Sequence, residues 1–215
     1  DEAKKCINTG KDHKSNPRTQ ARAWEMCRQL LSEAERDLNL ALDNSDYSTE
    51  KEFIQKDIEF LEKMKKSFSP CSFQPESQQF NFWIGEWKVY NLQGQQSGTS
   101  KIEQILNECV IQENWTDFFG NKGKSFNFYN SETKQWQQTW VDDKGSVTEF
   151  INGKFIDNAM RFQSSRSITN NGKKGVRRLT FFNVNSNEVR QLGEISYDKG
   201  KTWTTEYDLK YIREK

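Results

Sequence analysis

The 215-residue sequence contains a single histidine, His13. The remaining residues therefore cannot form a Ser-His-Asp or Cys-His catalytic arrangement, a zinc site built on histidines, or a proximal haem ligand. The sequence also lacks a CxxC pair, a phosphate-binding glycine loop and a dinucleotide fingerprint. We therefore expect neither a metal nor a cofactor.

The sequence also lacks an excess of one charge and a long apolar segment. Lys plus Arg number 32 and Asp plus Glu number 31, so the formal net charge is +1. This balance gives no electrostatic reason to expect nucleic acid or an anionic membrane as a partner. No apolar run approaches the ~20 residues that cross a bilayer, so no membrane span is expected.

Glycine is missing from a long part of the chain. Of the 12 glycines, only Gly10 precedes Gly85. The segment 68–79 is rich in Ser, Pro and Gln, which is typical of a linker. The change from helix formers to glycine-punctuated aromatic segments predicts two domains, an N-terminal arm with a helical hairpin over residues 1–75 and a β domain over residues 76–215.

Apolar residues in the first domain recur every three or four positions, which predicts two helices near 17–43 and 48–68. The sequence Asn44-Ser45-Asp46 between them is a turn signal, so the helices are expected to form an antiparallel hairpin. A tetratricopeptide array needs about three such units, and the sequence has one. We expect the hairpin to pack against the second domain, although a protein partner docking on residues 17–68 remains an alternative.

Four cysteines, Cys6, Cys27, Cys71 and Cys109, allow three disulfide pairings. The chain begins Asp-Glu-Ala-Lys-Lys without an initiator Met, which suits a removed signal peptide and a secreted or periplasmic protein. The alternative is four reduced thiols in a cytosolic protein. Counting from the hairpin turn brings Cys27 near Cys71, so this pairing is preferred and is worth roughly 4 kcal/mol. Cys6 and Cys109 would then pair or stay free.

The second domain alternates short strand patterns with turn sequences such as Gln93-Gly94, Asn152-Gly153 and Asp198-Lys199-Gly200. The strands are expected near 87–91, 98–106, 109–118, 123–130, 134–142, 146–152, 159–167, 176–184, 188–197 and 202–212. About ten sequential strands predict a mainly β, antiparallel up-and-down barrel beside the helical part. A closed barrel of eight to ten strands encloses a cavity for one small ligand.

Four segments of this domain carry a family resemblance: FNFWIGEW (80–87), CVIQENW (109–115), SFNFYN (125–130) and WQQTWVD (136–142). They resemble the FDFWIGEW, C-x-I-x-E-x-W, S-x-N-x-Y-D and W-x-Q-x-W-V-D motifs of an uncharacterised bacterial family of calycin-like domains. Asn130 stands where the family has Asp. The resemblance covers residues 80–212; more distantly, the architecture resembles fatty-acid-binding proteins and haem-carrying nitrobindins.

The pattern Gly85-Glu86-Trp87 resembles the opening of calycins, the lipocalin-like barrels. This resemblance implies that Trp87 plugs the closed end of the barrel beneath a basic residue from the end of the chain. Arg213 is the candidate for that residue, with Arg166 and Arg177 as weaker alternatives. Since the barrel lacks histidine, haem binding of the nitrobindin kind is not expected.

Strand periodicity places Trp136, Gln138 and Trp140 on one face of a strand. Two indoles on either side of an amide form an apolar slot with one hydrogen-bonding group, which is typical of small-ligand pockets. Alternatively, the indoles simply fill the barrel.

Glu113 and Trp115 share a face of the strand predicted at 109–118. If this face is interior, Glu113 is a buried carboxyl group that serves as a ligand anchor or as a general acid or base with a raised pKa. If the face is exterior, Glu113 is solvated. The next strand carries Ser125, Asn127 and Tyr129 on one face, and an interior Tyr129 would reach Glu113 or a ligand.

Two further patterns are interpreted as structural. Residues 196–203 match the Asp-box pattern SxDxGxTW, whose Asp and Ser bond turn amides and whose Trp packs beneath the hairpin. Lys173, Lys174, Arg177 and Arg178 form a short basic run that we interpret as solvated.

The sequence thus favours a protein that binds a small apolar or aromatic ligand in the barrel. The predicted ligand-binding residues are Trp115, Asn127, Trp136, Gln138 and Trp140. A second hypothesis is a cofactor-independent isomerase, cyclase or lyase in which Glu113 is the base and Tyr129 the acid. A third assigns the function to a protein-docking surface on the helical hairpin. Whether the protein is an enzyme stays open.

Overall fold

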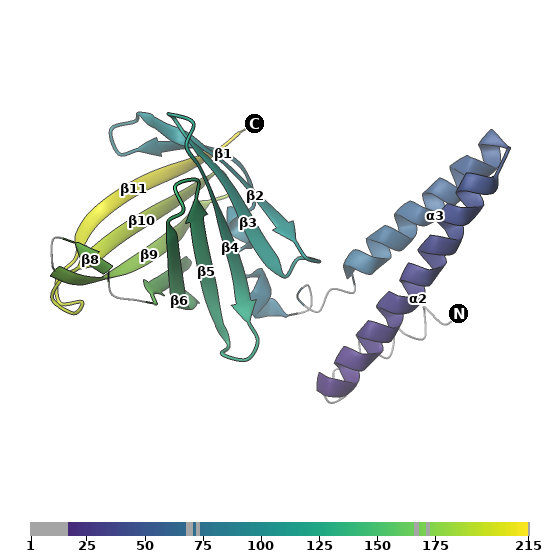
Figure 1. Ribbon diagram of the computed structural model, residues 1–215, viewed down its shortest axis with the longest axis horizontal. Helices are drawn as coiled ribbons and strands as arrows, with labels where there is room; N and C mark the ends of the chain where they lie inside the picture. The colour runs from purple at the N-terminus through teal and green to yellow at the C-terminus, as the bar shows by residue number, and fades with distance from the viewer. Residues whose placement is uncertain (1–16, 68–70, 72–73, 166–167, 171–172, 215) are drawn as a thin grey trace. The chain divides into compact units, whose positions relative to one another are not determined.

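The computed structural model describes residues 17–67, 71, 74–165, 168–170 and 173–214 (Figure 1). The chain divides into two units, Asp1–Gln74 and Pro75–Lys215. The first contains the helices α2 (Pro17–Asn44) and α3 (Ser48–Ser67). The second contains the short 3-10 helices η1 (Pro75–Gln78) and η2 (Asn81–Trp83), followed by a β-barrel.

Helices α2 and α3 form the predicted antiparallel hairpin. Leu31 of α2 is buried, with Leu61 and Met64 of α3 packed against it. In the connection, the Ser45 hydroxyl donates to a Glu50 carboxylate oxygen at 2.7 Å and accepts the Tyr47 amide at 3.3 Å. These bonds fix the start of α3. No helix in the described part of the chain is long and apolar enough to cross a membrane.

The barrel consists of ten strands that close on themselves, as the sequence predicted. Every pairing is antiparallel, each strand pairs with the next around the barrel, and β11 returns to β1. A short additional strand, β8 (Ile168–Asn170), pairs with the start of β9. The ten barrel strands are β1 (Gly85–Asn91), β2 (Gln96–Ile105), β3 (Val110–Asp117), β4 (Lys122–Asn130), β5 (Gln135–Asp142), β6 (Val147–Ile156), β7 (Ala159–Ser164), β9 (Lys173–Asn185), β10 (Glu188–Ser196) and β11 (Thr204–Arg213).

One predicted turn is wrong. Asn152-Gly153 does not end a strand, because β6 continues to Ile156 with an irregular register between Ile151 and Lys154. Asn152 has a φ of 56°, and a Cβ at position 153 would lie 2.5 Å from the carbonyl oxygen of Trp136. The Asn-Gly pair therefore forms a bulge where two backbones approach closely. The turn itself follows at residues 157–158.

The preferred disulfide is also wrong. Cys71 is bonded to Cys109, and Cys27 is disulfide-bonded as well, so a Cys27–Cys71 bridge does not exist. The prediction counted residues back and forward from the hairpin turn as if both were helical, whereas Cys71 lies beyond Ser67, the last residue of α3, so the count does not fix its position. Cys6, predicted to pair with Cys109 or stay free, lies outside the described residues.

One end of the barrel is filled by aromatic rings. Trp87 of β1 is buried, and its indole Nε1 donates to the Trp83 carbonyl at 2.9 Å. The Arg213 guanidinium lies 4.2 Å from the centre of the Trp87 ring and donates to the carbonyl oxygens of Ile84 and Ser186, at 3.0 and 2.8 Å. The prediction that Arg213 covers Trp87 is confirmed.

The 3-10 segment contributes further rings to this closed end. Phe80 and Trp83 are fully buried and stack with their centres 5.1 Å apart, while Phe181 of β9 lies 5.0 Å from Phe80. Because strands alternate in direction, the turns after β3, β5 and β10 all lie at the opposite end. The aromatic rings do not fill this opposite end, so a cavity can open there.

Candidate functional site

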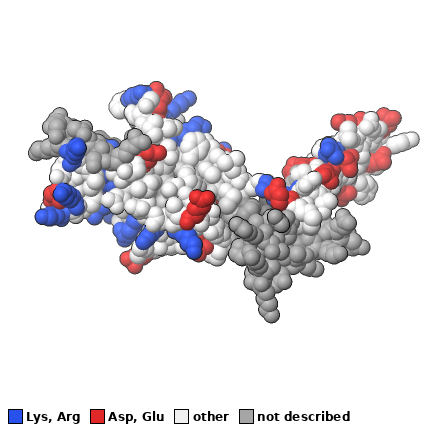
Figure 2. Space-filling model, turned by 60° about the horizontal axis from the view of Figure 1, so that its bottom comes forward, with Lys and Arg blue, Asp and Glu red and all other residues white. Residues whose placement is uncertain are grey.

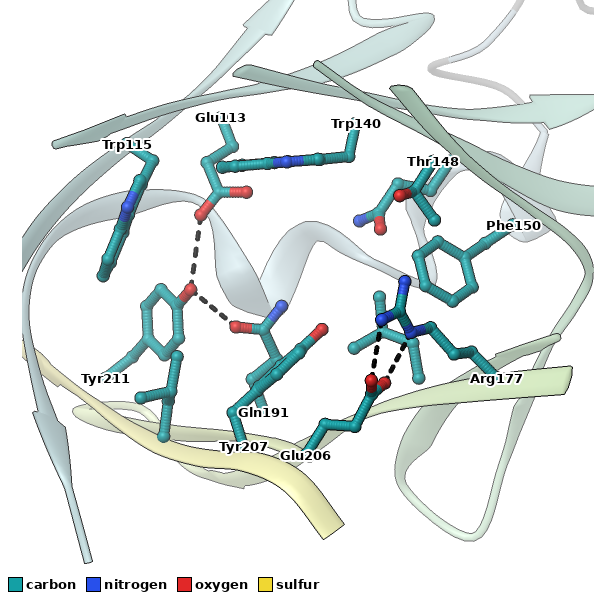
Figure 3. A pocket seen from close by; sticks show the side chains of 13 residues that line it. Glu113, Trp115, Trp140, Thr148, Phe150, Arg177, Gln191, Glu206, Tyr207 and Tyr211 are labelled. Carbon is teal, nitrogen blue, oxygen red and sulfur yellow. Dashed lines mark hydrogen bonds and ion pairs between the residues drawn. The ribbon is translucent and has the colours of Figure 1, made fainter. Parts of the chain in front are cut away.

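A cavity of about 360 Å³ lies inside the barrel (Figure 3). Its apolar and aromatic wall comprises Trp115, Trp140, Phe150, Leu179, Tyr207, Leu209 and Tyr211. Its polar lining comprises Glu113, Gln138, Thr148, Arg177, Gln191 and Glu206. At ~30 Å³ per molecule of liquid water, the volume corresponds to about a dozen waters, which suits one small organic molecule.

Glycines on neighbouring strands make room for the aromatic rings of the wall. A Cβ on Gly98 of β2 would lie 2.9 Å from the Trp115 ring. A Cβ on Gly123 of β4 would overlap the Trp140 ring, and one on Gly193 of β10 would overlap the Tyr207 ring. Each ring therefore lies over bare backbone, so these glycines determine how the rings face the cavity.

Glu113 of β3 is the buried carboxyl group of the cavity, with 3% of its surface exposed. Ser100 donates to its Oε1 at 2.8 Å, and Ser125 donates to its Oε2 at 3.0 Å. Burial raises the pKa of Glu113 from 4.5 to about 7, against the opposing effect of these hydrogen bonds. Near neutral pH, the group therefore exists in both protonation states.

Tyr211 of β11 is the third hydroxyl at this carboxyl group. Its oxygen lies 3.3 Å from Glu113 Oε1 and 2.8 Å from Gln191 Oε1. One phenolic proton serves one acceptor at a time. When Glu113 is protonated, it can donate to Tyr211, which then donates to Gln191. Burial, followed by the nearby Glu113 carboxylate, raises the pKa of Tyr211 well above 10, so the phenol stays neutral.

A directional hydrogen-bond chain supports Glu113 from the other side. Gln138 Nε2 donates to Asn127 Oδ1 at 2.7 Å, and Asn127 Nδ2 donates to Ser125 Oγ at 3.0 Å. Ser125 donates in turn to Glu113. Asn127 also donates to the Ile111 carbonyl at 3.0 Å, which fixes the orientation of its amide. The chain crosses β5, β4 and β3 and holds the carboxyl group in one position.

An ion pair forms another part of the cavity wall. Arg177 Nε lies 2.5 Å from Glu206 Oε2, and Arg177 Nη2 lies 2.7 Å from Glu206 Oε1. The Glu206 carboxylate raises the pKa of Arg177 above its ordinary value, so the guanidinium stays charged. The interpretation of Arg177 as part of a solvated basic run is therefore wrong.

Four of the predicted residues meet at the cavity: Glu113, Trp115, Gln138 and Trp140. The interior orientation of Glu113 is confirmed. Asn127 is completely buried in the hydrogen-bond chain behind the wall.

Trp136 and Tyr129 lie together toward the closed end. Trp136 is buried against Phe80, with ring centres 5.7 Å apart, and its Nε1 donates to the Glu76 carbonyl at 3.1 Å. Tyr129 packs edge-on against Trp136 at 6.2 Å, and burial together with the Glu76 carboxylate raises its pKa. Among the described residues, the phenol at Glu113 is that of Tyr211.

Sequence reasoning missed the half of the wall that comes from β6, β9, β10 and β11. Gln191 and Tyr211 lie on strands whose alternation predicts an interior face, but that pattern does not distinguish cavity lining from packed core. Arg177 and Glu206 belong to charged segments that are typical of exposed strands. Their pairing over the intervening strand β10 is visible only once the register of β9, β10 and β11 is known.

The Asp-box prediction is confirmed as structural. Asp198 Oδ1 accepts the Thr202 amide at 2.9 Å, and Ser196 Oγ accepts the Gly200 amide at 2.8 Å. The Thr202 hydroxyl is the main cause that lowers the pKa of Asp198 to about 2. Trp203 packs outside, with the Arg178 guanidinium 4.2 Å from its ring centre. The motif therefore shapes the β10–β11 hairpin.

The outer surface differs in character from the cavity. On the face drawn in Figure 2, Lys and Arg side chains are interspersed with Asp and Glu side chains. No group of His, Cys, Asp and Glu side chains among the described residues is arranged to hold a metal ion.

Comparison with protein-family models and with curated proteins finds no match to this chain.

Proposed function

We propose that this protein binds a small, largely apolar molecule inside the barrel. The observation that carries the proposal is the cavity of about 360 Å³ with indole, phenyl and leucine walls and a few fixed polar groups. Cavities of ~300–1,000 Å³ with this mixture of surfaces are the usual form of small-molecule sites. The hydrogen-bond chain behind Glu113 keeps the polar groups in place before a ligand arrives, which lowers the entropy cost of binding.

Indole is a suitable first probe, since it is neutral, flat and small enough for the cavity. We expect calorimetry to detect its binding to the wild-type protein. Trp140→Ala should abolish that binding because it removes one wall, whereas Glu113→Gln should only weaken it. Trp203→Ala is the matched control, since it removes an indole from the outer hairpin. Equal binding by the Trp140→Ala and wild-type proteins would refute the cavity as the site.

The arrangement of Trp87 and Arg213 supports membership of the calycin-like group. A tryptophan beneath an arginine from the last strand is what the resemblance of Gly85-Glu86-Trp87 to that group implies. The same resemblance is compatible with a ligand in the barrel. We further propose export from the cytoplasm, because the disulfide between Cys71 and Cys109 needs an oxidising compartment to persist.

A second candidate function is acid–base catalysis without a cofactor. The observation that favours it is a cavity carboxyl group with a pKa of about 7 and a phenol 3.3 Å away. In this candidate Glu113 is the base, and Tyr211 takes the acid role that the sequence assigned to Tyr129. Glu113→Gln would then preserve ligand affinity and remove turnover. Wild-type protein that returns a bound probe unchanged over many hours excludes catalysis on that probe.

A docking function of the helical hairpin rests on the exposed phenylalanines of α3. Phe53 and Phe60 are 70% and 60% exposed and lie seven residues apart on one face of the helix. Deleting residues 1–75 is a poor test, because it removes Cys71 as well as the hairpin and leaves Cys109 without its disulfide partner. The double variant Phe53→Ser/Phe60→Ser keeps the disulfide, and loss of a partner's affinity in this variant would support docking.

A further inference from the structure

Within the proposed small-molecule site, Glu113 forms no ion pair with any of the described Lys or Arg side chains. Its hydrogen bonds come from hydroxyl groups. The one cationic group in the cavity lining is Arg177, and Glu206 holds it in a bidentate pair. A buried carboxylate in such a setting lacks the charge partner that normally compensates for its loss of hydration.

The carboxyl group also has an unused acceptor position. A carboxylate offers about four lone-pair sites. Ser100 and Tyr211 occupy two of them on Oε1, and Ser125 occupies one on Oε2. One site on Oε2 remains for a donor that enters the cavity.

Aromatic rings surround this acceptor. Figure 3 shows Trp115, Trp140 and Tyr211 around the Glu113 carboxyl group, with Tyr207 across the cavity. The faces of such rings attract cations, by ~0.5–2 kcal/mol each depending on desolvation. A carboxylate enclosed by indole and phenol rings has the composition of a site for an organic cation.

The charge of the lining favours the same sign of ligand. With Glu113 ionised, the wall carries the two carboxylates of Glu113 and Glu206 against the single guanidinium of Arg177. An anionic ligand would have to displace Glu206 from Arg177 and would still face Glu113. A cation meets neither obstacle.

We propose, on the basis of the cavity-binding function above, that the ligand is an organic amine bound as its ammonium ion. The ammonium group donates to Glu113 Oε2 between the rings of Trp115 and Trp140. The apolar body of the ligand lies against Phe150, Leu179 and Leu209 in the cavity wall.

Binding of an amine is coupled to protons at Glu113. The cation stabilises the carboxylate form, so an amine that binds near pH 6 releases a proton from Glu113. The amine itself remains protonated below about pH 10. The charged and titratable groups around Glu113 are Tyr207 and Tyr211, both neutral at these pH values, and the Arg177–Glu206 pair along the wall. Affinity for an amine should therefore rise from pH 5 to pH 8 and then level off.

Phenethylamine and 2-phenylethanol are matched probes of similar size and shape that differ in charge. We expect titration calorimetry at pH 7 to show at least tenfold tighter binding of the amine. In Glu113→Gln the preference should disappear while the alcohol still binds. At pH 6, paired buffers of different ionisation enthalpy should reveal proton release on binding of the amine alone.

The possible outcomes distinguish the amine assignment from the more general proposal that the cavity binds a small molecule. Equal or tighter binding of 2-phenylethanol by the wild-type protein would overturn the amine assignment and leave the small-molecule function standing. An amine preference that persists in Glu113→Gln would also overturn it. If neither probe binds, both proposals fail. Trp203→Ala, which changes an aromatic residue outside the cavity, should behave as the wild type does with both probes.

Discussion

At the scale of single residues, Glu113 links the stability of the fold to pH. Its pKa is about 7 in the folded protein and near 4.5 in the unfolded chain, so between these values the folded state binds the extra proton. The free energy of unfolding should therefore decrease as the pH rises from 4.5 to 7, by on the order of 3 kcal/mol in total. Glu113→Gln should lack this decrease in urea titrations across the same range.

A matched control for this measurement is Glu86→Gln, which changes an exposed carboxylate on β1. Its stability should follow that of the wild-type protein at each pH. Parallel pH curves for the wild-type and Glu113→Gln proteins would mean that Glu113 does not titrate in this window.

Gly85 is a second residue with a defined physical role. It has a φ of 139°, which side chains rarely adopt, and a Cβ there would collide with the Arg213 guanidinium. Gly85→Ala should destabilise the protein by ~2 kcal/mol or more, from backbone strain and from the collision. In urea unfolding, the double variant Gly85→Ala/Arg213→Ala should lose less free energy of unfolding than the two single variants lose in sum.

Gly94→Ala separates the two causes. Gly94 has a φ of 78° and open space around it, so the alanine there adds strain without a collision. Gly94→Ala should cost less than Gly85→Ala. Strict additivity of Gly85→Ala and Arg213→Ala would contradict the contact between them.

At the scale of elements, the cavity depends on the fit between β4 and β5. Gly123→Ala would place a methyl group where the Trp140 ring lies, which should cost ~1–3 kcal/mol and turn the indole from its position. Combining it with Trp140→Phe should recover part of that loss, because the smaller ring leaves room. Chemical denaturation of the two single variants and the double variant measures the coupling, and its absence would contradict the predicted overlap.

The disulfide between Cys71 and Cys109 is tested by peptide mapping. Proteolytic digestion without reductant should yield a pair of peptides joined through Cys71 and Cys109. The double variant Cys71→Ser/Cys109→Ser should be less stable by up to about 4 kcal/mol, since the bond closes a loop of about 40 residues. A peptide pair joining Cys27 to Cys71 would contradict the assignment.

Most of the elements could be predicted from the sequence, because apolar and polar residues alternate along each barrel strand and turn residues bound it. Trp115, Gln138 and Trp140 were found in this way. The turn predicted at Asn152-Gly153 is wrong because an Asn-Gly pair can form either a turn or a bulge. Only the close approach of the Trp136 backbone to Gly153 decides between the two. The end of α3 was predicted to within one residue, because Pro70 limits how far a helix can continue.

The cavity could be predicted only in part, for a physical reason. Local patterns place a side chain inside or outside, but pairing across a closed barrel depends on register. Tyr129 and Tyr211 both belong to alternating strands, and register alone puts Tyr211 beside Glu113 and Tyr129 beside Trp136. The Arg177–Glu206 pair joins residues from β9 and β11, which are not neighbours in the sheet.

At the scale of the whole molecule, the barrel is closed at one end and hollow beyond it. The rings of Phe80, Trp83 and Trp87 fill the closed end, while Trp115 and Trp140 line the cavity. The tryptophans inside the barrel therefore form two groups, one packed at the closed end and one in the wall of the cavity.

The indole N–H resonances of the seven tryptophans test this division most directly. Once single Trp→Phe variants have assigned them in nitrogen-15 NMR spectra, indole can be titrated into the protein. We predict concentration-dependent shifts of the Trp115 and Trp140 resonances, with those of Trp83, Trp87 and Trp203 unchanged. Shifts confined to Trp203, or the absence of any shift up to millimolar indole, would contradict a ligand-binding cavity in the barrel.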